Sequence, residues 1–326
     1  MASAAPDAAL DAALILHHYD ASPYSEKIRL LFGYKGLDWR SVAMPPMLPK
    51  PDLMALTGAY RRAPVLQIGA DVYCDSALIV LEIERRFPGS SSASGSASTP
   101  ALAGGAAGAR AGLIAYLVDE DLFWRAVGYV MALRAGQIPQ ALLDDRAHMH
   151  PQMNFERGAL AAQLPHLADR LRPLLALLDA ALAEDDFLGG ALPAGGDFNL
   201  YHPLWFLQNA GALATLAPQA PHLHAWMARM AAFGHGRPSP MTPQQAIECA
   251  LRSEPAALAG ASTDAGPGIA AGTEVEVMPA GYPQEAVRGR LLALDGERVV
   301  VAHASPLAGL IHLHFPRLGY VVQTAA

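Results

Sequence analysis

Cysteine is nearly absent from this sequence, with only Cys74 and Cys249 among 326 residues. Two cysteines cannot form a disulfide framework, and their scarcity fits a reducing compartment. Charged residues are also few, at 16%, and no stretch concentrates lysine and arginine. Because nucleic acids and anionic membranes both require a basic surface, the net charge of −7 argues against either as a partner.

Long apolar runs and targeting segments are missing as well. No uninterrupted apolar stretch reaches the length that a bilayer-spanning helix needs. Residues 1–14 are alanine-rich and acidic, without the basic and apolar regions of a signal peptide. We therefore expect a cytoplasmic protein. Hydrophobic residues are plentiful, at 52%, which excludes a disordered acidic chain and is enough for sizeable cores.

Residues 12–88 alternate between strand and helix signals. Short apolar runs predict strands over 14–16, 39–44, 64–68 and 72–74, and helical spacing predicts helices over 22–35 and 76–87. Three prolines within 46–51 predict an irregular loop. The order is β-α-β followed by β-β-α, which predicts an α/β domain built on a mixed sheet.

The rest of the chain divides by composition. Small and polar residues dominate 89–109 and 254–272, which we interpret as flexible linkers. Between them, 110–253 carries long apolar helical patterns without a strand signal, which predicts an all-α helical bundle as the second domain. From 273 to 324 the apolar residues alternate with period two, which predicts four or five short strands in a small, barrel-like all-β extension.

Three short motifs follow one another in the first domain. They are Ser22–Arg29 (SPYSEKIR), Arg62–Leu66 (RAPVL) and Val72–Ile79 (VYCDSALI). In this order and at these separations they resemble the first-helix start, the cis-proline strand and the γ-glutamyl-binding turn of the glutathione S-transferase family. The resemblance covers about residues 12–252. It implies a thioredoxin-like N-terminal domain, an all-helical second domain, glutathione as cosubstrate and a homodimer, while the β-rich tail lies outside the usual family pattern.

Ser22 is the candidate catalytic residue that the resemblance implies. A sulfur at the N-terminus of its helix would meet the positive end of the helix dipole and accept a hydroxyl hydrogen bond, together lowering a thiol pKa by about two units. Ser22 could instead be an ordinary N-cap without a ligand, and Tyr19 is the alternative hydroxyl. Because Ser22 and Ser25 occupy the positions of a thioredoxin dithiol, dithiol chemistry and a Cys-type transferase are both excluded.

The resemblance also implies five glutathione-binding residues. A cis peptide before Pro64 would expose the backbone of Ala63 to the cysteinyl backbone of glutathione. Ser76, at a helix N-terminus, would bind the γ-glutamyl carboxylate, and Asp75 would receive the γ-glutamyl ammonium. Arg62 would lie near the glycyl carboxylate. As an alternative, Asp75 and Ser76 would do no more than begin a helix.

No metal is expected. His312 and His314 would share one face of a strand, as a metal site requires, but no acidic or cysteine ligand accompanies them at metal spacing. The family's Ser-x-x-Asp capping box in the helical domain is reduced to Asp197, because Ala194 replaces the serine. Cys74 is interpreted as a structural, buried residue rather than a nucleophile.

The leading hypothesis is therefore a glutathione S-transferase that adds the glutathione thiolate to a hydrophobic electrophile, as in detoxification. Phe123, Trp124 and Tyr129 are the candidates for the apolar half of the site. Two alternatives stay open. One is a non-catalytic ligand-binding or protein-interaction module, which the unusual tail suggests. The other is a glutathione-dependent lyase or isomerase, which would need the same glutathione site.

Overall fold

Two units make up the chain, and each combines segments that are distant in sequence. The structure, a computed structural model, describes residues 12–89, 102–103, 105–258, 268–281 and 285–325. The first, here called the sheet unit, contains the residues up to 25, 38–79 and those from 237 onward. The second, the helical unit, contains 26–37 and 80–236.

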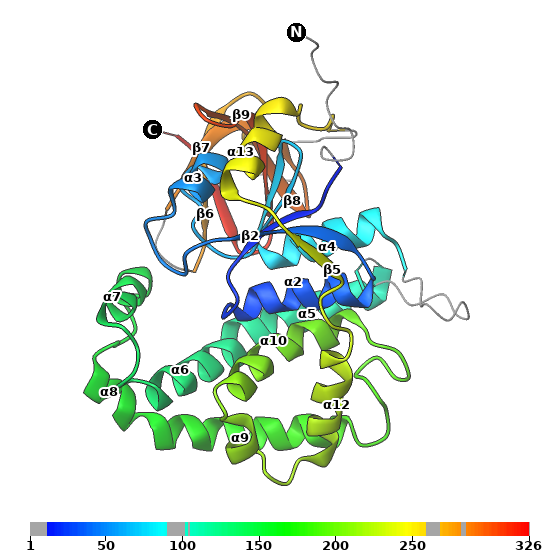
Figure 1. Ribbon diagram of the computed structural model, residues 1–326, viewed down its shortest axis with the longest axis vertical. Coiled ribbons are helices and arrows are strands. Elements are labelled where there is room, and N and C mark those ends of the chain that lie inside the picture. The colour runs from blue at the N-terminus through cyan, green and yellow to red at the C-terminus, as the bar shows by residue number, and fades with distance from the viewer. Residues whose placement is uncertain (1–11, 90–101, 104, 259–267, 282–284, 326) are drawn as a thin grey trace. The chain divides into compact units, whose positions relative to one another are not determined.

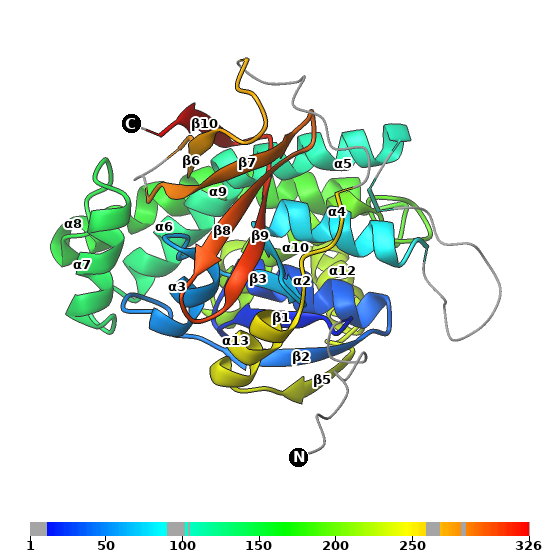
Figure 2. The ribbon, with the colours of Figure 1, turned by 90° about the horizontal axis from the view of Figure 1, so that it is seen from above.

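One sheet of ten strands forms the sheet unit (Figure 2). Its strands are β1 (Ile15–His18), β2 (Asp38–Ala43), β3 (Val65–Ile68), β4 (Asp71–Cys74), β5 (Arg237–Pro240), β6 (Glu274–Pro279), β7 (Val287–Leu294), β8 (Arg298–Ser305), β9 (Gly309–Pro316) and β10 (Tyr320–Thr324). Their order across the sheet is β10-β6-β7-β8-β9-β4-β3-β1-β2-β5. The unit also contains the helices α3 (Pro51–Thr57) and α13 (Pro243–Arg252).

The N-terminal part of this sheet has the predicted thioredoxin-like connectivity. β1 and β2 are parallel and are joined by α2 (Pro23–Tyr34). β3 pairs antiparallel with β1, β4 pairs antiparallel with β3, and α4 (Ser76–Arg86) follows. Every residue of β1, β3 and β4 is buried, which explains why these strands are continuous apolar runs rather than alternating patterns.

The C-terminal strands continue the same sheet. β6, β7, β8 and β9 pair antiparallel in succession, and β10 pairs with β6. β9 then runs parallel to β4, with Asp71 opposite His312 and Tyr73 opposite His314. The predicted β character of the extension is confirmed, but the expected small barrel is wrong, because the β4–β9 seam joins these strands to the thioredoxin-like strands in one open sheet. Period two assigns residues to faces of a sheet but does not say which strand is the neighbour.

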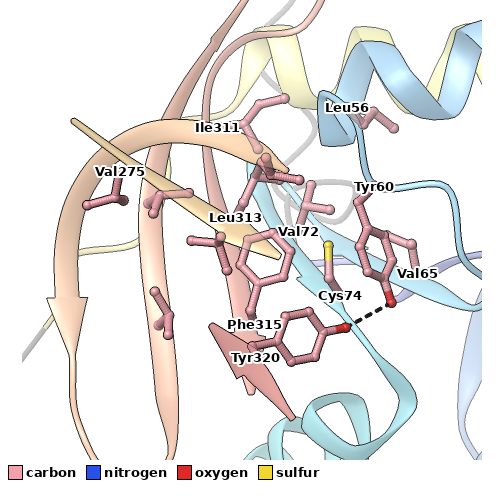
Figure 3. Close-up of a cluster of buried hydrophobic side chains, with 14 of the residues drawn as sticks. Leu56, Tyr60, Val65, Val72, Cys74, Val275, Ile311, Leu313, Phe315 and Tyr320 are labelled. Atoms are coloured by element: carbon pink, nitrogen blue, oxygen red, sulfur yellow. Dashed lines mark hydrogen bonds between the residues drawn. The ribbon is translucent and has the colours of Figure 1, made fainter. Parts of the chain in front are cut away.

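A buried apolar cluster extends across the β4–β9 seam (Figure 3). Val72 and Cys74 of β4 belong to it together with Leu313 and Phe315 of β9, and all four are completely buried. Burying a large apolar side chain contributes about 1.5–3 kcal/mol. The seam is therefore stabilised by a shared core as well as by strand hydrogen bonds.

Besides most of α2 and of α4, the helical unit contains the described helices that lie between α4 and β5 in the chain (Figure 1). They are α5 (Gly105–Leu117), the π-helical turn η1 (Val118–Leu122), α6 (Phe123–Leu133), α7 (Gln140–Met149), α8 (Arg157–Ala162), α9 (Leu164–Ala181), α10 (Gly195–Asn209), α11 (Leu213–Leu216) and α12 (Pro221–Ala231). The predicted helical domain is confirmed. Within the described residues, no helix has both the length and the apolar character needed to cross a membrane.

Asp197 compensates for the missing serine of the capping box. Its Oδ2 accepts a hydrogen bond from the N–H of Ala194 at 2.8 Å. Its Oδ1 accepts from the N–H of Leu188 at 2.9 Å and from the indole N–H of Trp226 at 2.8 Å. Three donors thus satisfy a fully buried carboxylate. Asp197 therefore caps the start of α10 by itself, because Ala194 has no side-chain oxygen to accept the second hydrogen bond of a capping box.

Three short elements were not predicted. α3 occupies the end of the proline-rich loop, because Pro51 stands at the first helical turn, where its missing N–H costs nothing. β5 contains two prolines but lies at the sheet edge beside β2, the one place where strands tolerate proline. α7 was not predicted because its sequence has no marked apolar stripe.

Of the predicted linkers, residues 90–101, 104 and 259–267 lie outside the described residues, and α5 begins at Gly105.

A buried polar pair lies between β1 and β3. His17 Nε2 and Gln67 Oε1 are 2.9 Å apart, while the Gln67 amide group donates to the carbonyl oxygens of Gly69 (3.0 Å) and Ala246 (2.8 Å). Because both amide protons are used, Gln67 Oε1 must accept, and His17 must be the Nε2–H tautomer. Burial lowers the pKa of His17 to about 4.

The depressed pKa of His17 makes stability depend on pH. The unfolded chain takes up this proton near pH 6.5 and the folded chain near pH 4, so stability is lost as the pH falls between these values. From about pH 7.5 to about pH 5.5 the loss should be about 1.4 kcal/mol. Urea unfolding at both pH values should show that His17→Gln loses that much less than the wild type. The exposed His222→Gln is the control, and an equal loss in His17→Gln would contradict this assignment.

Candidate active site

The three sequence motifs meet at one end of three neighbouring strands. β3 is antiparallel to both β1 and β4. The end of β1, the start of β3 and the end of β4 therefore lie at the same edge of the sheet. Tyr19 directly follows β1, Pro64 directly precedes β3 and Asp75 directly follows β4. Strand pairing thus brings together Tyr19, Pro64 and Asp75, although up to 56 positions separate them in the sequence.

Ser22 is the N-cap of α2. Its N–H donates to the carbonyl oxygen of Tyr19 at 3.1 Å, and its Oγ accepts from the N–H of Ser25 at 3.2 Å. Capping uses the hydroxyl oxygen as an acceptor, whereas a thiolate would accept the hydroxyl proton. The two interpretations of Ser22 are therefore compatible. The Ser25 hydroxyl oxygen is buried and has no hydrogen-bond partner among the described residues.

The turn between β4 and α4 has an unusual backbone. Asp75 adopts a left-handed φ of 80°, which non-glycine residues rarely do and which is concentrated at functional sites. Asp75 Oδ1 accepts from the N–H of Ala77 at 2.9 Å, and its carbonyl oxygen accepts from the N–H of Ile79 at 3.1 Å. Asp75 therefore caps α4, and Ser76 is its first helical residue. The Ala63–Pro64 peptide at the neighbouring motif is cis, as the resemblance implies.

The C-terminal tail contributes a side chain to this turn. The Tyr320 hydroxyl, from β10, lies 3.1 Å from Asp75 Oδ2 and 3.5 Å from the hydroxyl of Tyr60 (Figure 3). An ionised carboxylate can only accept, so Tyr320 donates to Asp75. Sequence reasoning missed Tyr60 and Tyr320, because no local pattern connects residues separated by the whole length of the helical unit.

Burial sets the protonation of the groups around Asp75. It raises the pKa of the Tyr60 and Tyr320 hydroxyls well above their usual range, and the negative charge of Asp75 adds to the shift. The positive charge of Arg62 acts in the opposite direction on the pKa of both hydroxyls. Both tyrosines stay protonated at neutral pH, so they are hydrogen-bond donors and not bases.

A second tail contact lies beside the cis-proline loop. Arg61 is buried, and its Nη1 pairs with a carboxylate oxygen of Glu285 at 3.3 Å. Lys50 is also buried, donates to the carbonyl oxygen of Arg61 at 2.8 Å and lies 5.8 Å from the ring centre of Tyr19. These cations surround the residues that the sequence implicates in glutathione binding, and the sequence analysis did not include Lys50 or Arg61.

Other candidates from the sequence lie elsewhere. Phe123 and Tyr129 are buried in the helical unit, and Trp124 is half-buried there. His312 and His314 are joined by Asp71, which the β4–β9 seam places beside them. The reason for expecting no metal, the lack of an acidic partner, therefore does not hold in the folded chain.

Comparison with known proteins identifies the family. A model of the glutathione S-transferase N-terminal domain matches residues 16–91, and one of the C-terminal domain matches residues 161–229. The structure of a glutathione S-transferase-like protein from Pseudomonas syringae is 35% identical, with a TM-score of 0.73, over 96% of this chain and 100% of that one. The chain belongs to the glutathione S-transferase family.

Further solved structures share the fold at lower identity. The theta-class enzyme from Xanthomonas axonopodis pv. citri, solved with glutathione bound, is 21% identical with a TM-score of 0.50, over 69% of this chain and 97% of that one. A glutathione S-transferase from Rhodospirillum rubrum is 16% identical with a TM-score of 0.51, over 67% and 88%. The match to the Pseudomonas protein covers 96% of this chain, which is long enough to include most of the β-rich tail. Among curated proteins, no sequence matches the chain.

Cys74 directly precedes Asp75, yet its environment excludes it as a nucleophile. Burial and the Asp75 charge raise the pKa of its thiol well above the usual range. In a Cys249→Ser variant, Cys74 should therefore react with a disulfide reagent at least about 100-fold more slowly in the native protein than in urea. Rapid labelling of the native variant would show that this turn opens to solvent.

Proposed function

We propose that this protein binds glutathione at the edge formed by Tyr19, Pro64 and Asp75 and activates its thiol for attack on a hydrophobic electrophile. The observation that carries the proposal is the meeting of the three family motifs at one edge of the sheet. The left-handed Asp75 turn and the capped start of α2 lie at the same edge. Family membership makes glutathione the ligand to test first.

Ser22 stabilises the thiolate in this proposal. Its oxygen already accepts the Ser25 N–H, so its proton is the part of the hydroxyl that a sulfur anion would take. A hydrogen bond to a charged partner contributes about 1.5–3 kcal/mol, and the helix dipole adds about 0.3–1 kcal/mol. The thiol proton leaves to solvent on binding. The thiolate then forms the bond to the electrophilic carbon, which either releases its leaving group with the bonding electron pair or, in an addition to a double bond, passes the π electron pair to the neighbouring atom, which takes a proton from solvent. Ser22 stays protonated throughout.

The γ-glutamyl end of glutathione occupies the start of α4. Ser76 and the helix N-terminus receive its carboxylate, and Asp75 receives its ammonium. Asp75 keeps capacity for this, because a carboxylate offers about four acceptor positions and Tyr320 and Ala77 use two. Arg62 adds positive charge for a ligand carboxylate beside the same turn, and the Ala63 backbone pairs with the cysteinyl residue.

The remaining parts of the proposal follow the family pattern. Trp124, which is partly exposed within the helical unit, is the aromatic candidate for binding the electrophile. The protein acts as a homodimer in the cytoplasm. A glutathione-dependent lyase or isomerase would use the same glutathione site, and it differs in that turnover consumes no net glutathione.

Replacing Ser22 tests the thiolate role. Ser22→Ala should raise the pKa of bound glutathione by about one to two units and lower kcat/KM near neutral pH about 10- to 100-fold. Titration calorimetry with glutathione and the pH profile of conjugation would measure both. Binding of the thiol form should change little, because only the anion loses its hydrogen bond.

Two controls separate chemistry from folding. Ser25→Ala removes a buried hydroxyl one turn away and should leave the pH profile unchanged, whereas Ser22→Thr keeps a hydroxyl at the N-cap and should retain most activity. Loss of the cap itself costs about 1 kcal/mol of stability, which urea unfolding would report. Full activity in Ser22→Ala would move the role to Tyr19.

A second candidate function has its own support. Tyr320 and Glu285 of the tail already engage Asp75 and Arg61, two groups beside the proposed ligand position. A transferase-like module that no longer binds glutathione could keep its site filled in this way. The transferase proposal instead makes Tyr320 a positioning residue that orients Asp75 for the ammonium group.

The Tyr320→Phe variant distinguishes the two functions. If Tyr320 positions Asp75, the Kd for glutathione should rise about 5- to 10-fold while kcat changes little, since about 1 kcal/mol of orientation is lost. The matched control is Tyr34→Phe, in the helical unit. Tighter glutathione binding in Tyr320→Phe would mean that the tail competes with the ligand and would favour the non-catalytic module.

A further inference from the structure

The β4–β9 seam gathers two histidines and one carboxylate at its amino-terminal end. Asp71 of β4 is the register partner of His312 on β9, and His314 lies two residues further on the same face. Each residue offers one ligand atom, and the three ligand atoms all lie within 4.8 Å of one another. Because β4 separates Asp71 from Asp75 by about 13 Å of extended chain, this group is distinct from the proposed glutathione site.

The distances within the group suit a small metal ion. Asp71 Oδ1 lies 2.7 Å from His314 Nε2 and 3.7 Å from His312 Nδ1. Ligand atoms around tetrahedral zinc, at bond lengths of 2.0–2.1 Å, are about 3.3 Å apart. The first distance is about 0.6 Å shorter than this and the second about 0.4 Å longer, so shifts of the ligand atoms by about half an ångström would bring both into range.

One ligand atom has an unmet requirement. His312 Nδ1 is buried and has no hydrogen-bond partner among the described residues. Leaving a buried polar atom unpaired costs about 1–3 kcal/mol, so native structures rarely do so without a reason. The hydrogen bond between Asp71 and His314 does not involve His312, so it provides no partner for His312 Nδ1.

The neighbours hold the ligands in place. Asp71 Oδ2 accepts from the N–H of Ala256 at 2.7 Å, which leaves Oδ1 turned toward the histidines. The His314 ring stacks on the Tyr73 ring with centres 4.4 Å apart and planes at 16°. Contacts of this kind orient metal ligands in known sites. Asp71 and His314 are buried, while the His312 side chain keeps 14% of its surface exposed, which provides a route of entry.

We propose that Asp71, His312 and His314 bind a divalent first-row transition-metal ion, with zinc the best match, that clamps β9 to β4. Two imidazole nitrogens and one carboxylate oxygen are typical zinc ligands, whereas calcium and magnesium favour sites made of oxygen atoms. When the ion binds, His314 is the Nδ1–H tautomer, so its Nε2 lone pair and Asp71 Oδ1 turn to the ion in place of the hydrogen bond between them, and His312 Nδ1 gains a partner. Water completes the coordination. The bound ion stabilises the attachment of the C-terminal tail to the sheet.

The test uses the full-length protein without a histidine tag, freed of metal by a chelator. Calorimetric titration with ZnCl₂ should show one ion bound per chain, and CoCl₂ should give the visible absorption of a four-coordinate nitrogen–oxygen site. The melting temperature should rise with zinc concentration, because the ion binds the folded seam and not the unfolded chain. MgCl₂ should produce none of these effects.

Variants identify the ligands. His312→Gln leaves the Asp71–His314 hydrogen bond intact and should weaken zinc binding at least about 100-fold with little change in metal-free stability. Asp71→Asn should weaken it similarly. His303→Gln is the matched control, because His303 is a partly exposed tail histidine outside the group. Zinc binding that His312→Gln leaves unchanged, or that His303→Gln abolishes, would overturn the proposal, as would a wild type that binds no zinc. None of these measurements involves glutathione.

Discussion

The parallel pairing of β4 with β9 is the constraint on which the sheet unit depends. It joins a thioredoxin-like sheet to five C-terminal strands and makes one buried core of residues from both. Without it, β4 would be a sheet edge with unpaired backbone groups, which proteins avoid. Its backbone hydrogen bonds, its shared apolar cluster and the buried pair of Asp71 and His314 all stabilise the same junction.

The β4–β9 seam also determines which side chains lie near the residues that are proposed to bind glutathione. Because β9 lies beside β4, the strands that follow bring Tyr320 to Asp75, and the segment before β7 brings Glu285 to Arg61. The tail is thus part of the environment of the turn at Asp75. A transferase-like protein from Pseudomonas syringae matches 96% of this chain, a length that includes most of the tail.

Local sequence signals predicted most of the elements and the central site residues. Ser22 before Pro23 predicted a helix start, and Asp75 before Ser76 predicted another, because capping depends on residues within one turn. The same local signals missed α3 and β5. In both, prolines were taken as interruptions, whereas a first helical turn and a sheet edge tolerate them.

The sequence by itself determined the thioredoxin-like domain, the helical domain and the β character of the tail, and it supplied the residues proposed to bind glutathione. Each of these follows from patterns within a few residues or from motifs in a fixed order. Only the tertiary structure decided that the tail joins the same sheet, that Tyr320 reaches Asp75, and that Asp71 accompanies His312 and His314. These depend on which strand lies beside which, and the pairing of β4 with β9 spans more than 230 residues. A periodic pattern specifies a buried face, but the partner that covers it is selected by the packing of the whole unit.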